Sequence, residues 1–155
     1  YTPAVDFPRL STVASRFEQG YRFWPAFQAF HSVSTADLLH LVAHSMGCAF
    51  AEGLACGAVK DGYTIGKVGY INCYQAQDLV ISTERQYTID YQLCDDPLIN
   101  NRMLSLVGHA RPGAVQGATY QLRQYSGINN PLKRHRAPIA LWGRAFWTHL
   151  AELLS

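Results

Sequence analysis

The sequence has little charge, no long apolar run and no closely spaced cysteine pair. Only 15% of its 155 residues are charged, and the formal net charge is +2. Nucleic-acid-binding domains usually carry a strongly basic face, so binding to a phosphate backbone is not expected. No run reaches the ~18 to 20 apolar residues of a membrane-spanning helix, and no secretory leader pattern opens the chain. We therefore expect no nucleic-acid partner and no transmembrane segment, while the cellular location stays open.

The cysteines and histidines do not suggest a metal site. Cys48, Cys56, Cys73 and Cys94 lie far apart in apolar stretches and form no C-x-x-C pair. Free cysteine is among the most buried residue types, so we predict small buried side chains, with a disulfide framework as the alternative. No His, Cys and Asp residues have metal-ligand spacing. Neither a metal nor an organic cofactor is expected.

Apolar residues are 48% of the chain, which suffices for the core of one domain. The hydrophobic pattern predicts an alternation of strands and helices. Strands are expected at residues 38–43, 67–73, 86–93 and 117–125, and helices at residues 17–30, 46–60, 97–107 and 138–154. A strand, helix, strand order favours parallel pairing. We predict an α/β domain with a mostly parallel sheet flanked by helices.

Some elements allow a more detailed prediction. The first helix is expected to break or start near Pro25. The run at residues 38–43 is almost wholly apolar, as in strands covered on both faces. In the third strand, apolar residues alternate on one face: Tyr87, Ile89, Tyr91 and Leu93. The helix over residues 46–60 contains Gly47, Gly53 and Gly57. Each interior glycine costs a helix about 1 kcal/mol relative to alanine, so three glycines predict close packing against the sheet.

The segment Ala43-His44-Ser45-Met46-Gly47 places a serine between an apolar strand and a helix rich in small residues. A nucleophilic serine on a sharp strand-to-helix turn needs this context, with small residues two positions before and after it. The helix N-terminus adds partial positive charge, and the Met46 backbone N–H is a candidate oxyanion donor. The alternative is a serine that only caps the helix.

Residues 39–53 resemble the nucleophile-elbow region of α/β-hydrolase lipases and esterases, with Ala43 in place of the usual first glycine. The resemblance implies a partial α/β-hydrolase fold and a Ser, acid, His triad in that chain order, with the acid after a later strand and the histidine after the last strand. Asp95 and Asp96 both follow the third predicted strand, and the family's spacing fits Asp96 better.

Chain order also limits the choice of the base. His31 and His40 precede Ser45, and His44 flanks it. His135 follows the last predicted strand through a loop, which is the family's position, whereas His109 comes before that strand. We predict Ser45, Asp96 and His135 as catalytic residues, with Asp95 and His109 as alternatives. The basic neighbours of His135 also suit a solvated loop.

The predicted activity is hydrolysis of a small-molecule or lipid carboxylic ester through an acyl-enzyme on Ser45. Thioester or amide cleavage on the same scaffold is an alternative within enzymes. A catalytically inactive binding module is the alternative from another class.

In the family the elbow strand is the fifth of about eight, and the second oxyanion donor follows the third. Residues 1–155 are therefore expected to form a single domain that lacks its N-terminal strands. An unpaired apolar edge at residues 38–43 would favour association, and the chain alone should be poorly soluble or weakly active.

Overall fold

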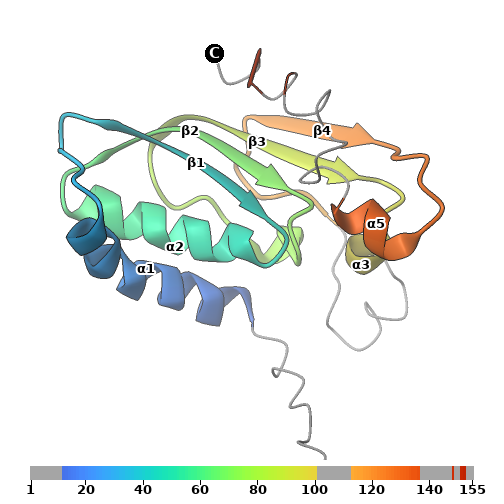
Figure 1. The fold of residues 1–155 in the computed structure, drawn as a ribbon, viewed down its shortest axis with the longest axis horizontal. Coiled ribbons are helices and arrows are strands. Elements are labelled where there is room, and N and C mark those ends of the chain that lie inside the picture. Colours follow the sequence, from blue (N-terminus) through green and yellow to red (C-terminus); the bar gives the residue numbers. More distant parts are fainter. Residues whose placement is uncertain (1–11, 101–112, 137–147, 149–150, 153–155) are drawn as a thin grey trace, which may run out of the picture.

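The computed structural model describes residues 12–100, 113–136, 148 and 151–152. Four parallel strands form one sheet in the order β1-β2-β3-β4: β1 (Leu38–His44), β2 (Thr64–Ile71), β3 (Arg85–Leu93) and β4 (Tyr120–Gln124). Helices α1 (Val13–Phe30) and α2 (Gly47–Lys60) lie side by side along one face of the sheet, and all four strands point toward the same edge (Figure 1). The predicted α/β class with a mostly parallel sheet is confirmed.

Three short helices lie in the connections that follow the strands. They are η1 (Ala76–Asp78) after β2, α3 (Pro97–Asn100) after β3 and α5 (Pro131–Arg136) after β4. The helix predicted over residues 97–107 begins at Pro97, and its continuation lies outside the described residues. Most of the helix predicted over residues 138–154 also lies outside them. A helix was not predicted at α5, where basic side chains suggested a loop.

Close packing between α1 and α2 explains Gly53 and Gly57 of α2. An ideal Cβ placed on Gly53 would lie 1.9 Å from the Phe17 carbonyl oxygen, and one on Gly57 would lie 2.7 Å from the Trp24 Cβ. In the opposite direction, a Cβ on Gly20 would lie 1.9 Å from a carbonyl oxygen of α2. The prediction that these glycines pack against the sheet is therefore wrong, because they bring two helix backbones into contact.

The prediction of a break at Pro25 is also wrong, since α1 continues through this residue. Proline removes one helical hydrogen bond and costs about 3 kcal/mol in a helix interior. Tertiary packing on both sides offsets that cost. Trp24 is buried and donates its indole N–H to Asp61 at 2.9 Å, and Phe27 packs on the same core.

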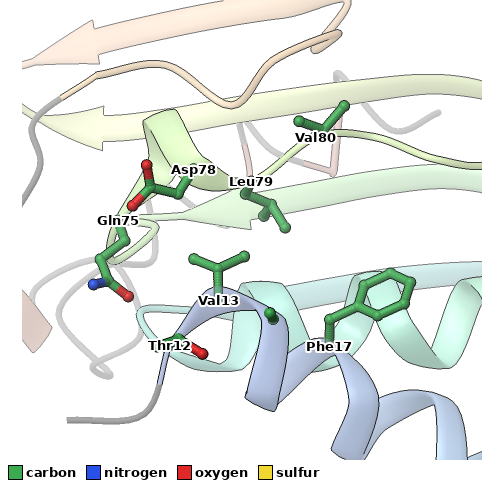
Figure 2. Close-up of a pocket in the computed structure, with 8 residues that line it drawn as sticks. Thr12, Val13, Phe17, Gln75, Asp78, Leu79 and Val80 are labelled. Carbon is green, nitrogen blue, oxygen red and sulfur yellow. The ribbon is translucent and has the colours of Figure 1, made fainter.

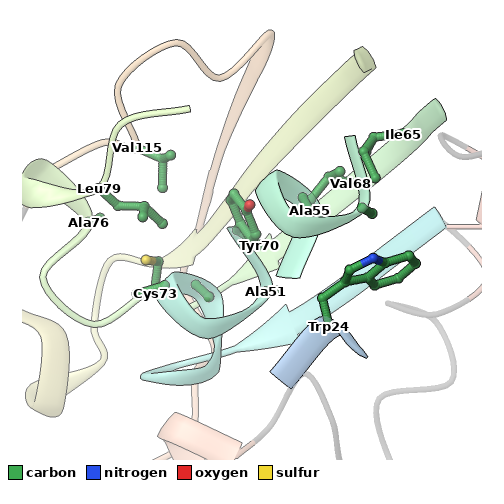
Figure 3. Close-up of a cluster of buried hydrophobic side chains, with 13 residues drawn as sticks. Trp24, Ala51, Ala55, Ile65, Val68, Tyr70, Cys73, Ala76, Leu79 and Val115 are labelled. Atoms are coloured by element: carbon green, nitrogen blue, oxygen red, sulfur yellow. The ribbon is translucent and has the colours of Figure 1, made fainter. Parts of the chain in front are cut away.

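The main hydrophobic core lies between the sheet and the two long helices. Figure 3 shows it extending from Trp24 at one end to Cys73, Leu79 and Val115 at the other, with Tyr70 beside α2. All four cysteines are free thiols; Cys48 and Cys73 are buried, whereas Cys56 and Cys94 are partly exposed. The disulfide alternative is excluded, and the prediction of buried cysteines holds for two of the four.

Strands β1, β2 and β4 differ from their predictions in extent or exposure. The second strand begins and ends earlier than residues 67–73, and the fourth is shorter than residues 117–125. Leu38 and Val42 of β1 are 40% and 46% exposed, so the prediction of a strand covered on both faces is wrong. The cause is the position of β1 at one edge of the described sheet, where the helices cover only the face that carries Leu39 and Leu41.

The predicted apolar face of β3 is confirmed. Ile89, Tyr91 and Leu93 form a second buried cluster with Ile71, and Tyr87 packs against its rim.

Among the helices of the described residues, none has the length and apolar character required to cross a bilayer.

A buried ion pair connects α2 to the strands. The Glu52 carboxylate is fully buried and accepts from the Arg85 guanidinium at 2.7 Å, and the Tyr70 hydroxyl donates to it at 2.5 Å. Burial disfavours the Arg85 cation, but the charges of Glu52 and Tyr70 and their hydrogen bonds together outweigh this effect and raise the pKa of Arg85. Burial also raises the pKa of Tyr70 well above its usual value. This network joins the middle of α2, the helix that follows Ser45, to β2 through Tyr70 and to β3 through Arg85.

Candidate active site

Ser45 lies on a strained turn between β1 and α2. Its φ of 56° is in the left-handed region, where a residue other than glycine costs about 1 to 2 kcal/mol. Backbone hydrogen bonds hold the turn: the Ser45 N–H donates to the Ile71 carbonyl at 2.9 Å, and the Ser45 carbonyl accepts from the Tyr74 N–H at 3.2 Å and from the Cys48 N–H at 3.3 Å. The Ser45 side chain is therefore presented at the carboxyl edge of the parallel strands.

The structure brings Ser45, His135 and Asp96 together in one hydrogen-bonded chain. The Ser45 Oγ lies 3.0 Å from the His135 Nε2, and the His135 Nδ1 lies 2.6 Å from the Asp96 Oδ2. His135 is 8% exposed and Asp96 is fully buried. In this geometry, the carboxylate can hold the proton on Nδ1, which leaves Nε2 free to accept the proton of the Ser45 hydroxyl.

Asp96 is oriented by its own backbone surroundings. Its N–H donates to the Leu93 carbonyl at the end of β3 at 3.1 Å, and its Oδ1 accepts from the Leu98 N–H in the first turn of α3 at 2.9 Å. One carboxylate oxygen is thus held by the helix start, and the other faces His135. This division of the two oxygens fixes the direction in which the imidazole is held.

Asp95 points to a different partner set. Its carboxylate accepts from the Ser126 N–H at 3.0 Å and from the Ser126 hydroxyl at 2.7 Å, and it lies 3.5 Å from the Arg134 guanidinium. Partial burial opposes ionisation, but these hydrogen bonds and the Arg134 cation outweigh it and lower the pKa of Asp95. Asp95 therefore ties the segments after β3 and β4 together.

The short helix α5 is held to the segment after β3. Asn130 accepts the Lys133 N–H through its side chain at 3.0 Å and the Arg134 N–H through its carbonyl at 2.9 Å. The Arg134 guanidinium donates to the Ile128 and Asp95 carbonyls, both at 2.6 Å. The basic residues of this segment suggested a solvated loop, but one of them, Arg134, has a structural function.

The Met46 backbone N–H lies at the start of α2, next to Ser45. Among the described residues, none accepts a hydrogen bond from this N–H. The helix N-terminus also contributes partial positive charge at this position. The group has the place expected of an oxyanion donor. The loop expected to supply a second donor follows a strand beyond β1, and the described sheet contains no such strand.

The small residues of the turn differ in their packing. Ala43 packs against the main core. An ideal Cβ on Gly47 would meet no described atom within 4 Å. The prediction that Gly47 prevents a collision between strand and helix is therefore wrong for the described residues, because α2 leaves the turn with open space beside Gly47.

The remaining histidines have other positions. His109 lies outside the described residues, so its alternative as base is not tested by geometry. His40 accepts the Lys67 N–H through Nδ1 at 3.0 Å, and His31 follows the last residue of α1. His44 and Asn72, which sequence reasoning did not assign to the site, both contact the His135 backbone.

A pocket of about 490 Å³ lies between the start of α1 and the turn after β2. Figure 2 shows Val13 of α1 and Leu79 facing each other across it. Ser45, Asp96 and His135 are not among its lining residues, so this pocket does not define the route of a substrate to the serine. Among the described residues, no group of three His, Cys, Asp or Glu side chains could hold a metal ion.

Comparisons with protein-family models, curated proteins and solved structures give no significant match to this chain.

Proposed function

We propose that this protein is a serine hydrolase that cleaves carboxylic esters through an acyl-enzyme on Ser45. The observation that carries the proposal is the hydrogen-bonded chain from the Ser45 Oγ through His135 to the buried Asp96. The positive φ of Ser45 and its place before α2 add support, since both are required of a nucleophile presented on a strand-to-helix turn. A serine that only capped the helix would need neither the strain nor the histidine.

The proposed reaction has two halves. In the first, His135 Nε2 takes the hydroxyl proton as the Ser45 Oγ attacks the ester carbonyl carbon. The Met46 N–H donates to the oxyanion, and the Asp96 carboxylate stabilises the imidazolium. The carbon–oxygen bond to the alcohol then breaks, and Nε2 returns its proton to the leaving alkoxide. In the second half, His135 Nε2 takes a proton from water as the water oxygen attacks the acyl carbon. The bond from that carbon to the Ser45 Oγ then breaks, Nε2 returns the proton to Oγ, and the acid and free Ser45 are released.

The test combines a covalent probe with turnover. A fluorophosphonate should phosphonylate Ser45 with loss of fluoride, and mass spectrometry locates the adduct. Ser45→Ala should abolish labelling and reduce hydrolysis of a p-nitrophenyl ester by about 10⁴-fold or more, as is usual for such a nucleophile. The matched control is Ser32→Ala, because Ser32 is an exposed serine between α1 and β1.

The outcomes separate the alternatives. If the probe does not label Ser45 in the folded protein, the protein is not an active serine hydrolase and the binding-module alternative is favoured. If Ser45→Ala keeps more than a tenth of the turnover, Ser45 is not the nucleophile. Matched ester, thioester and amide substrates then show which leaving group is preferred, because the arrangement of Ser45 and His135 does not by itself select one.

A further inference from the structure

The backbone carbonyl of His135 is held by two side chains from different strand ends. The His44 Nε2 lies 3.0 Å from this oxygen, and the Asn72 Nδ2 lies 3.2 Å from it. His44 is the last residue of β1 and directly precedes Ser45, whereas Asn72 directly follows β2. A carbonyl only accepts, so both side chains donate, and His44 carries its proton on Nε2.

Asn72 is built into this position. It is fully buried, its φ of 46° is in the left-handed region that asparagine tolerates, and its N–H donates to the Tyr91 carbonyl at 2.8 Å. Its Oδ1 accepts the Leu93 N–H at 2.8 Å. That bond fixes the orientation of the amide, so Nδ2 must face His135.

His44 can lie beside His135 without adding a second positive charge. The two rings lie 4.6 Å apart between centroids. Burial lowers the pKa of His44, which keeps its ring neutral at neutral pH. A neutral His44 can donate through Nε2 and places no positive charge next to the imidazolium that forms on His135 during the proposed reaction.

We infer that His44 and Asn72 are positioning residues that hold the His135 backbone so that its Nε2 stays within reach of the Ser45 Oγ. The inference rests on the proposed function for its effect on rate. The carbonyl and the imidazole belong to the same residue, and α5 has only six residues. A displacement of about 1 Å at a reacting group can cost ~10²-fold in rate, so two donors on one carbonyl have a direct kinetic value.

The kinetic test uses two substitutions at His44. His44→Leu removes the donor and puts an apolar side chain in its place, whereas His44→Gln offers an amide N–H near the position of Nε2. His44→Leu should lower kcat for the ester by roughly 10- to 100-fold with KM changed less than about twofold, because substrate binding is not altered. His44→Gln should recover at least about half of the lost activity on a logarithmic scale. The exposed His31→Leu is the matched control.

A second readout does not depend on turnover. The proton between His135 Nδ1 and Asp96 is observable by NMR, and its exchange with water reports how firmly the ring is held. His44→Leu and Asn72→Asp should both speed this exchange, since aspartate keeps the acceptor for Leu93 and loses the donor. His44→Gln should slow it again.

The failures of the two proposals are distinguishable. If the wild-type protein is labelled at Ser45 and His44→Leu keeps its kcat and its slow exchange, the positioning inference is overturned and the proposed function stands. If the wild-type protein is not labelled, the proposed function fails. In that case the exchange rates of the same variants still decide whether His44 and Asn72 hold His135.

Discussion

Replacing each of the two neighbouring aspartates with asparagine should separate catalysis from stability. Asp96→Asn puts an amide in place of the carboxylate 2.6 Å from His135 Nδ1. If the NH₂ of the new amide faces the ring, Nδ1 must become the acceptor and Nε2 the donor, so Nε2 can no longer take the proton of Ser45. An exchange of tautomer of this kind costs about 10³- to 10⁴-fold in kcat.

The fold should tolerate Asp96→Asn. The side-chain oxygen can still accept the Leu98 N–H, and the change removes a buried carboxylate that has no lysine or arginine as an ion-pair partner among the described residues. We expect the free energy of unfolding to change by no more than about 1 kcal/mol. Urea unfolding and ester hydrolysis, measured on the same preparation, give the two quantities.

Asp95→Asn should do the reverse. It weakens two hydrogen bonds from Ser126 and the ion pair with Arg134, so stability at pH 7 should fall by about 1 to 2 kcal/mol, a decrease in Tm of roughly 2 to 8 °C. kcat at a temperature where the variant is folded should change less than about tenfold. Equal losses of kcat in the folded Asp95→Asn and Asp96→Asn variants would refute this division of roles.

The stability difference between wild type and Asp95→Asn should depend on pH with a definite sign. Because the pKa of Asp95 is lowered in the folded state, its charge stabilises the protein above the unfolded pKa of about 3.9 and ceases to do so as the pH falls through the lower folded value. The stability deficit of Asp95→Asn relative to wild type should therefore shrink below about pH 4. A deficit that stays constant across that range would show that the carboxylate charge is not the cause.

Two further predictions concern the scaffold. Gly53→Ala should destabilise the protein by about 1 to 3 kcal/mol in chemical unfolding, since its Cβ would lie 1.9 Å from the Phe17 carbonyl oxygen, whereas Gly47→Ala in the same helix should be neutral or stabilising; equal stabilities would contradict the contact between α1 and α2. Arg85→Met should cost about 3 to 5 kcal/mol because it leaves the Glu52 carboxylate buried and unpaired, and Arg85→Met with Glu52→Leu should recover part of that loss; a small effect of the single change would show that Glu52 is not held as an anion.

Local sequence patterns were sufficient for β3 and for the turn that carries Ser45, but not for α5, which carries His135. The period of two in β3 identified its buried apolar face, and the apolar run before Ser45 with small residues after it identified a strand-to-helix turn. The resemblance of residues 39–53 to a nucleophile elbow then implied a triad of Ser45, Asp96 and His135, with Asp95 and His109 left as alternatives. The structure brings these three side chains within hydrogen-bond distance, although Ser45 and His135 are 90 residues apart in sequence.

Local patterns did not predict features that depend on how distant elements pack together. The glycines of α2 are visible in the sequence, but whether they face the sheet or another helix depends on where α1 docks. Pro25 predicts a helix break from local energetics alone, and core packing of Trp24 and Phe27 offsets its cost. The exposure of Leu38 and Val42 depends on the place of β1 at the sheet edge, which strand order decides.

The sequence by itself determined the α/β class and the position of Ser45 on a turn between a strand and a helix, because both follow from periodicity over a few residues. Only the tertiary structure decided between Asp95 and Asp96 as the partner of His135, since adjacent residues leave a strand in different directions and each found a partner from a distant segment. Only the tertiary structure also placed His44 and Asn72 on the His135 carbonyl. Those contacts join the ends of β1 and β2 to α5, and contacts of such sequence separation have no local signature.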